Sequence, residues 1–439
     1  MQASCKPEGH PFIVSPNFWC SLSLRHQLYK VFEALGHFEA PADVVLRGHF
    51  RANPQLGRSQ RHQIAEACFY MLRHRRRLNQ QPFTTATKDW PQDLKWNNRA
   101  SLIEKTLYEM RNGFGDLSHL PAPIKYSLPE WLYERLMAQG ASDLLFQALL
   151  EPAALDLRIA TWHPKHQSVA RERLIDSLRE EGIVAHPHPD VAQALRVEGK
   201  PALEKSASFN KGLLEVQDVA SQAVAALLAP RRNQTLVDFC AGAGGKTLAL
   251  AIAMRNTGQV YACDNNTTRL ARLKPRLVRS GLSNVQPFAI DSEVDPKLVR
   301  LASKADAVLV DAPCSGFGTL RRNPDLKWRF KADDLERLVV QQASILQAAS
   351  RLVRPGGWLV YATCSLLREE NQDQVLAFLE ASEQFELESP MQVLQSQGIS
   401  LGRELALESA GKHHGMVWQT DPSSDGCDGF FAARMRRRV

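Results

Sequence analysis

From about residue 213 onward, short apolar segments alternate with longer amphipathic ones, and this alternation constrains the fold more than any other feature of the chain. Short strands that alternate with helices are typical of a parallel sheet covered by helices on both faces. The segments predicted to be strands are TLVDFC, QVYACD, VQPFAI, DAVLVDA, GWLVYATC, MVWQT and FFAARM. The sequence therefore predicts a doubly wound α/β domain with a mostly parallel sheet over residues 213–439.

Two further regions precede this domain. Before residue 150, the segments RHQLYKVFEAL, RHQIAEACFYMLRHRRRL, NRASLIEKTLYEM and LPEWLYERLMAQ place apolar residues at helical spacing. After residue 150, LDLRIATW and GIVAHPHP are typical of strands, and HQSVARERLIDSLREEG is typical of a helix between them. We therefore expect a helical domain over 1–150 and a small α+β domain over 151–212.

The first strand of the α/β domain runs into a glycine-rich turn, CAGAGGKT, at 240–247. Glycines there permit positive φ, and the following helix offers its amino-terminal amides to an anionic group. A phosphate-binding loop would need glycine where Cys240 stands, and a dinucleotide fingerprint would need it where Thr247 stands. The remaining candidate is S-adenosylmethionine, whose carboxylate can meet the helix terminus.

Acidic residues at the ends of later strands favour a nucleoside ligand. Asp264 can accept hydrogen bonds from the ribose hydroxyls, and Asp291 can accept one from an adenine amino group, while Asp311 ends the next strand. Each of these acids is equally compatible with a helix N-cap or a turn. Three of them at successive strand ends indicate a binding site.

Two of the eight cysteines, Cys314 and Cys364, directly follow strands of the predicted sheet. A free cysteine is most often a small buried hydrophobic residue, but the shared edge of the sheet favours a function for this pair. The cysteines form no C-x-x-C pair and show no zinc-ligand spacing, so neither a metal site nor a disulfide framework is expected.

The charge distribution indicates a polyanionic partner. The net charge is +7, and the stretch 51–80 contains seven arginines and one acid. Arginine matches phosphate geometry, although a solvated helix face would explain the same run. Trp328 and Arg329 are candidates for stacking on, or clamping, a target base, although Trp328 is equally compatible with a core or interface residue. No apolar run has the length of a membrane span, and the first residues lack a signal-peptide pattern, so a cytoplasmic monomer is expected.

Several motifs together resemble the Sun/RsmB-like family of RNA cytosine carbon-5 methyltransferases. The motifs are VQDVASQ at 216–222, DFCAGAGGKT at 238–247, DAPCSGFGTLRRNPD at 311–325, YATCSLLREEN at 361–371 and DGFFAARM at 428–435. One departure is Gly242-Ala243, where many relatives have Ala-Pro. The resemblance extends from about Leu155 to the carboxyl end, and it implies a Rossmann-like methyltransferase domain. The stretch FRANPQLGRSQRHQIAEACFYMLR is similar to ribosomal-RNA members, which favours ribosomal RNA as substrate.

The resemblance also implies a role for each site residue. Cys364 would be the nucleophile that adds to carbon 6 of cytosine, Cys314 would aid product release, and Asp311 would contact the cofactor or the base. Asp264 would hold the ribose of S-adenosylmethionine and Asp291 its adenine. The methionine part would be lined by Cys240, Ala241, Gly242, Ala243, Gly244, Gly245 and Lys246.

The residues alone do not choose between the two thiols, and cytosine methyltransferases acting on DNA use the Pro-Cys cysteine instead. Three alternatives therefore remain beside the RNA enzyme that the resemblance favours. They are a DNA cytosine methyltransferase, a transfer-RNA cytosine methyltransferase, and a noncatalytic RNA-binding or ribosome-assembly factor that retains the fold.

Overall fold

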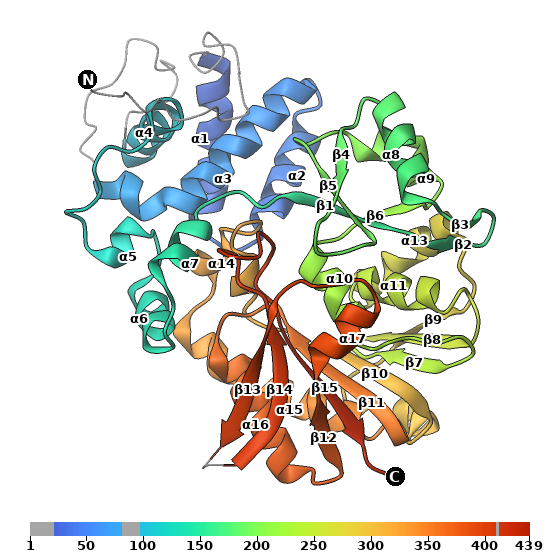
Figure 1. The fold of residues 1–439 in the computed structure, drawn as a ribbon. Coiled ribbons are helices and arrows are strands. Elements are labelled where there is room, and N and C mark those ends of the chain that lie inside the picture. Colours follow the sequence, from blue (N-terminus) through green and yellow to red (C-terminus); the bar gives the residue numbers. More distant parts are fainter. Residues whose placement is uncertain (1–21, 81–96, 410–411) are drawn as a thin grey trace, which may run out of the picture. The chain divides into compact units, whose positions relative to one another are not determined.

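The computed structural model describes residues 22–80, 97–409 and 412–439, with only the backbone described at 412 and 413 (Figure 1). It contains two compact units. The helical unit consists of Met1–Tyr133 and Asn323–Arg329, and the α/β unit consists of Glu134–Arg322 and Phe330–Val439. The first residues, to which the signal-peptide prediction refers, lie outside the described part. No helix within the described ranges is both long and apolar enough to cross a membrane.

The helical unit is built from amphipathic helices whose apolar stripes meet in one core. Leu28, Ile64, Leu72 and Ile103 are almost completely buried in it. The four predicted helices are confirmed, whereas α2 and α5 were not predicted. The helices are α1 (Leu22–Gly36), α2 (Ala42–Ala52), α3 (Arg58–Gln80), α4 (Asn98–Asn112), α5 (Ala122–Lys125), α6 (Glu130–Ala138), which continues into the other unit, and α14 (Leu326–Arg329).

The arginines near the end of α3 are packing residues of this unit. Arg76 donates to the Leu128 carbonyl at 2.7 Å, and Arg77 donates to the Lys125 carbonyl at 2.5 Å. The guanidinium of Arg75 lies over the ring of Phe38, 4.6 Å from its centroid. Their aliphatic stems and planar heads therefore cover the core and satisfy carbonyl groups. The charge run at 73–77 is thus not the solvated surface that its composition suggests.

Trp328 also belongs to the helical unit, where it is a packing residue, the second of the two roles that the sequence leaves open for it. Its side chain packs against the core of that unit, and its indole N–H donates to the Leu72 carbonyl at 2.6 Å. The single donor of the indole is therefore satisfied within this unit.

The α/β unit begins with α7 (Asp143–Ala148) and a small antiparallel sheet in the order β4-β5-β1-β6. Leu157, Leu178, Leu195 and Leu214 form its buried core. The predicted strand at 155–162 is interrupted, because it pairs first with β5 and β6 and then forms a separate short hairpin. The elements are β1 (Leu155–Ile159), β2 (Trp162–His163), β3 (Gln167–Ser168), α8 (Arg171–Glu180), β4 (Ala185–Pro187), β5 (Ala194–Val197), η1 (Leu203–Lys205), α9 (Ala207–Asn210) and β6 (Leu214–Val216).

A nine-stranded sheet forms the centre of this unit in the described residues, with the order β13-β14-β15-β11-β10-β7-β8-β9 and β12 paired with β15. Strands β9, β8, β7, β10 and β11 are parallel, and the remaining ones are antiparallel. The strands are β7 (Thr235–Asp238), β8 (Gln259–Asp264), β9 (Val285–Ala289), β10 (Ala305–Asp311), β11 (Val353–Thr363), β12 (Phe385–Glu388), β13 (Arg403–Ser409), β14 (Lys412–Gln419) and β15 (Phe431–Arg437).

Both faces of this sheet are covered by helices, as the alternation of the sequence predicts. Leu236 faces the core beneath α10, α11 and α17, while the next residue, Val237, faces the core beneath α15 and α16. The helices are α10 (Val219–Ala226), α11 (Gly245–Ala253), α12 (Thr267–Ala271), α13 (Leu273–Ser280), α15 (Ala332–Ser350), α16 (Gln372–Ala381) and α17 (Pro390–Ser396), with short turns η2 (Pro296–Leu301), η3 (Phe317–Thr319) and η4 (Arg368–Glu370).

The chain reverses direction across the sheet between β7 and β10. From β7 it proceeds through β8 to β9, and it then returns to place β10 on the other side of β7. Ligands of open α/β sheets bind at such a switch point, outside the carboxyl ends of the strands. A ligand site is therefore expected beside Asp238 and Asp311, which end β7 and β10.

Loss of the buried ion pair in the helical unit should strongly destabilise it. Arg25 Nε donates to Glu104 Oε1 at 2.5 Å, and both side chains are only 6% exposed. Arg25→Met leaves Glu104 buried without this partner, so the free energy of unfolding should fall by about 3–5 kcal/mol. Arg47→Met breaks an ion pair whose two side chains are 58% exposed and should cost less than about 0.5 kcal/mol. Equal shifts in urea denaturation of the full chain would contradict this assignment.

Candidate active site at the carboxyl edge of the sheet

The glycine turn between β7 and α11 needs glycine at two positions. Gly242 has φ +55° and Gly244 has φ +83°, both in the left-handed region. A Cβ at Gly244 would lie 2.2 Å from Leu273 Cδ1, and one at Gly242 would lie 2.7 Å from an Arg269 side-chain nitrogen. Leu273 and Arg269 therefore pack closely against one side of the turn. Residues of the turn also line a cavity.

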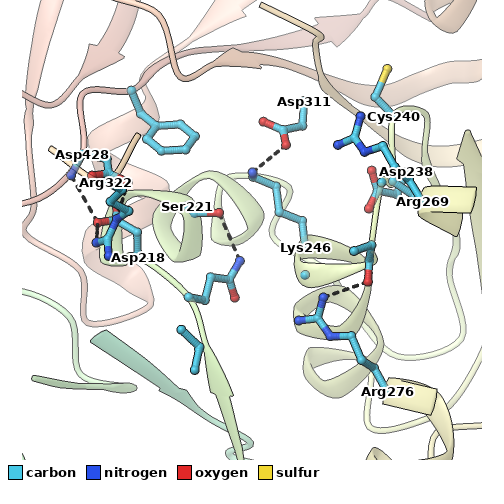
Figure 2. A pocket seen from close by; sticks show the side chains of 17 residues that line it. Asp218, Ser221, Asp238, Cys240, Lys246, Arg269, Arg276, Asp311, Arg322 and Asp428 are labelled. Atoms are coloured by element: carbon cyan, nitrogen blue, oxygen red, sulfur yellow. Dashed lines mark hydrogen bonds and ion pairs between the residues drawn. The ribbon is translucent and has the colours of Figure 1, made fainter. Parts of the chain in front are cut away.

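This cavity has a volume of about 390 Å³, within the range of small-molecule sites. In Figure 2, Asp218, Arg322 and Asp428 lie on one side of it, Cys240, Asp238 and Arg269 lie on the other, and Lys246 extends between them toward Asp311. The lining residues are Val216, Gln217, Asp218, Ser221, Asp238, Cys240, Ala241, Gly242, Ala243, Gly245, Lys246, Arg269, Arg276, Asp311, Arg322, Asp428 and Phe430.

Lys246 and Asp311 form an ion pair across the switch point. The ammonium nitrogen lies 2.7 Å from Asp311 Oδ2 and 5.2 Å from the centroid of the Phe430 ring. Burial opposes the charge of Lys246, but the attraction of Asp311 and the hydrogen bond to it outweigh burial and raise the lysine's pKa. The lysine is thus held as a cation beside a carboxylate that is 30% exposed.

Asp238 ends β7 beneath this pair and is almost fully buried. Its Oδ2 accepts a hydrogen bond from the Thr247 hydroxyl at 2.6 Å. Burial, reinforced by repulsion from Asp311 and Asp264, raises the pKa of Asp238 to about 7 although the Thr247 bond and Lys246 act in the opposite direction. Asp264 and Asp311 each lie close enough to repel Asp238. A positively charged group of a ligand would therefore be stabilised beside them.

Asp264 and Asp291 do not line the cavity. Asp264 is buried, and its two oxygens accept from the backbone N–H groups of Gly242 and Asn266, both at 2.7 Å. The carboxylate therefore positions the glycine turn. The Asp291 side chain is 94% exposed, with Lys297 3.8 Å away, because β9 ends before it and the following turn directs it outward.

The two cysteines predicted from the motifs lie side by side. The sulfur atoms of Cys314 and Cys364 are 3.4 Å apart, on the loops that follow the parallel strands β10 and β11. The hydrogen bond between the two thiols, together with burial, raises the pKa of Cys314 well above its ordinary value. Burial also raises the pKa of Cys240, which does line the cavity.

Sequence reasoning missed the ion-pair cluster on the opposite wall. Arg322 binds Asp218 and Asp428, each at 2.7 Å. Burial and the nearby Asp218 raise the pKa of Asp428 to about 7, although Arg322 acts against this shift. Each of the three residues lies in a different motif: Asp218 in VQDVASQ, Arg322 in GTLRRNPD and Asp428 in DGFF. A charged residue in each of these motifs was the sequence signal that could have predicted the cluster. Among the described residues, no group of three or more His, Cys, Asp or Glu side chains is arranged to hold a metal ion.

The titration of Asp238 should be visible in stability. Its pKa is raised from 3.8 to about 7, so the folded protein keeps a proton that the unfolded chain releases, and the free energy of unfolding decreases as pH rises from about 4 to about 7. Asp238→Asn keeps the side-chain size and removes this titration. The difference in free energy of unfolding, variant minus wild type, should therefore increase by at most about 4 kcal/mol between about pH 4 and pH 7. Urea denaturation at several pH values measures this, and parallel pH profiles would contradict it.

Comparison with known proteins identifies the family. Residues 225–436 match the 16S rRNA methyltransferase RsmB/F family. A probable ribosomal RNA small subunit methyltransferase B from Synechocystis sp. is 34% identical over 322 residues, which cover 71% of this chain and 67% of that protein. Ribosomal RNA small subunit methyltransferase B from Vibrio cholerae is 35% identical over 301 residues, covering 67% of each chain.

A solved structure of a methyltransferase homolog from Pyrococcus horikoshii has 25% sequence identity and a TM-score of 0.61. The alignment covers 74% of this chain and all of that one. The alignments with the two sequence relatives span about two thirds of their length. The chain therefore belongs to the RsmB/F methyltransferase family.

Proposed function

We propose that the protein is an S-adenosylmethionine-dependent methyltransferase that methylates carbon 5 of cytosine in ribosomal RNA. The observation that carries this proposal is the pair of thiols, Cys314 and Cys364, with their sulfur atoms 3.4 Å apart at the edge of the sheet. Carbon 5 of cytosine is a poor nucleophile, so its methylation benefits from covalent activation by a thiolate. A methyltransferase that acts on an oxygen or a nitrogen would not need such a pair.

The residues around the cavity fit S-adenosylmethionine. Gly245 and Lys246 place the amino-terminal turn of α11 against the cavity, and Lys246, Arg269 and Arg276 provide positive charge for the methionine carboxylate. Gly242 lines the cavity and has no side chain, so a ligand can approach its backbone closely. When bound, the cofactor supplies a methyl group on a sulfonium sulfur.

We assign the cofactor contacts as the motifs suggest. Residues 240–246 would line the methionine part, and Asp264 would bind the ribose while it holds the Gly242 amide. Asp291 would accept a hydrogen bond from the adenine amino group. Asp311 faces the cavity and would contact the cofactor or ring nitrogen 3 of the target base, where a carboxyl group can offset developing charge.

Cys364 would be the nucleophile. Its thiolate adds to carbon 6 of cytosine, a carbon–sulfur bond forms, and the ring electrons move to carbon 5, which takes the methyl group. A base then removes the carbon-5 proton, the carbon–sulfur bond breaks, and the electron pair returns to the sulfur of Cys364. Cys314 keeps its proton because its pKa is raised, so it can donate a hydrogen bond to the Cys364 thiolate both before addition and as it leaves.

The substrate class follows from the relatives, whose names describe ribosomal RNA methyltransferases. RNA targets are recognised mostly where bases are unstacked. The helical domain at 1–150 and the small α+β domain at 151–212 would bind RNA, while the methyltransferase domain at 213–439 would transfer the methyl group. The protein would act as a cytoplasmic monomer.

Removing each thiol should produce a different defect. Cys364→Ala should reduce methyl transfer to RNA by roughly three orders of magnitude or more, because no covalent activation remains. Cys314→Ala should still form the bond to cytosine but release it slowly, so a protein–RNA adduct should accumulate on denaturing gels. Labelled S-adenosylmethionine and unmodified ribosomal RNA provide the assay.

Cys68→Ala is the control for these variants, because Cys68 is buried in the core of the helical unit. Full activity of Cys364→Ala would refute the assignment of the nucleophile. If the wild type binds RNA but transfers no methyl group to ribosomal RNA, transfer RNA or DNA, the protein is an assembly factor that retains the fold.

RNA contacts of the helical domain should involve its exposed arginines rather than those at 73–77. Arg51 lies in the last turn of α2 and Arg58 begins α3, and both side chains are exposed. The double substitution Arg51→Glu and Arg58→Glu should weaken RNA binding and reduce the slope of log affinity against log salt by up to about 2, if each arginine meets one phosphate. Glu substitutions at Arg337 and Arg354, exposed arginines of the methyltransferase domain, provide the charge-matched control. An unchanged affinity and slope would exclude this surface.

A further inference from the structure

A buried carboxylate, Glu370, lies between the two loops that carry the cysteines. It ends the short turn η4, which follows the Cys364 loop, and its side chain has no exposed surface. A buried carboxylate is costly unless hydrogen bonds compensate the lost hydration. The donors that compensate Glu370 are all uncharged, and they come from both cysteine loops and from α15.

On the Cys314 loop, the contacts of Glu370 begin at the next residue. Ser315 donates its backbone N–H to Oε1 at 2.7 Å and its hydroxyl to Oε2 at 2.5 Å. Gln342 of α15 donates to Oε1 at 3.0 Å and also to the carbonyl of Pro313 at 2.9 Å. The residues on both sides of Cys314 are therefore fixed by the same hydrogen-bond network.

On the Cys364 loop, the contact is again made by the residue that follows the cysteine. The Ser365 hydroxyl donates to Glu370 Oε2 and lies 3.1 Å from the Ser315 hydroxyl oxygen. Asn371 donates to the Ser365 carbonyl at 3.0 Å, and the Leu367 N–H donates to the Ser365 hydroxyl oxygen at 3.0 Å. One carboxylate oxygen thus binds the serine after each cysteine.

We infer that Glu370 is a positioning residue that holds the Cys314 and Cys364 loops together and thereby keeps the two sulfur atoms at contact distance. Charge-assisted hydrogen bonds are stronger than neutral ones, so the carboxylate is a better clamp than an amide in the same place. Neither loop fixes this distance by itself, because the two cysteines are 50 positions apart and follow different strands.

The consequence for catalysis rests on the proposed function. The thiol of Cys314 can assist departure of Cys364 only while the two sulfurs remain in contact. Loosening the loops should therefore slow release of the adduct. Because the adduct then accumulates, kcat and the KM for RNA should fall together while kcat/KM stays nearly unchanged. A residue with only a general structural role would not produce this pattern.

The proximity of the thiols can be measured without RNA or cofactor. Phenylarsine oxide binds two neighbouring thiols, forming two arsenic–sulfur bonds and releasing water, so its affinity reports their separation. The full-length wild type should bind it tightly, and Cys314→Ala should abolish this tight binding. Glu370→Ala should weaken binding at least tenfold, and Glu370→Gln, which keeps the shape and part of the acceptor capacity, should restore part of it.

Glu369→Ala is the matched control, because the neighbouring Glu369 is 30% exposed and pairs with Arg135. It should bind the arsenical as the wild type does. If Glu370→Ala does not unfold cooperatively, the double variant Ser315→Ala and Ser365→Ala tests the same contacts while keeping the carboxylate. In methyl-transfer assays, folded variants with a loosened clamp should accumulate the adduct as Cys314→Ala does.

The outcomes separate this inference from the proposed function. Weaker arsenical binding by the Glu370 variant without methyl transfer by any variant would support the clamp and refute the enzyme. Wild-type arsenical affinity and adduct release in a folded Glu370→Ala variant would refute the clamp, even if the wild type methylates RNA.

Discussion

Parallel strands end at one edge of a sheet, and all the chemistry proposed for this chain depends on that constraint. Asp238 ends β7, Asp311 ends β10, and Cys364 follows β11, so residues far apart in the sequence converge at this edge. The reversal between β7 and β10 opens the space into which the glycine turn and α11 project. The antiparallel strands β12–β15 continue the sheet beside β11, and Phe430, which precedes β15, lines the cavity.

The charges at this edge are balanced in pairs. Asp311 stabilises the buried cation of Lys246. On the opposite wall, Arg322 neutralises the carboxylates of Asp218 and Asp428. Burial raises the pKa of Asp238, because the hydrogen bond from Thr247 and the charge of Lys246 offset the lost hydration only in part. The cavity is thus bordered by ion pairs whose members can exchange partners with a charged ligand. A zwitterionic ligand with a carboxylate, an ammonium and a sulfonium suits this arrangement better than a phosphate does.

Periodicity predicts the parallel strands and the antiparallel strands β14 and β15, but it misses several shorter elements between them. The strand predicted at 259–264 has the bounds of β8, because a strand buried on both faces has a continuous apolar sequence. Strand β12, helix α17 and strand β13 were not predicted, since short half-exposed segments carry little periodic signal. The arginines at 73–77 were misjudged for another reason. Their partners, Phe38, Lys125 and Leu128, are distant in the sequence, and composition does not reveal such contacts.

The paired thiols could be predicted from sequence, but what holds them together could not. In both motifs, Pro-Cys-Ser and Thr-Cys-Ser, a cysteine is followed by a serine. Successive side chains of an extended segment point to opposite sides, so a cysteine that faces a reaction site places the next residue toward the interior. A hydroxyl buried there needs a hydrogen-bond partner. Glu370 satisfies the hydroxyls of both serines, and one interior carboxylate thereby couples two active-site loops that the sequence presents as independent motifs.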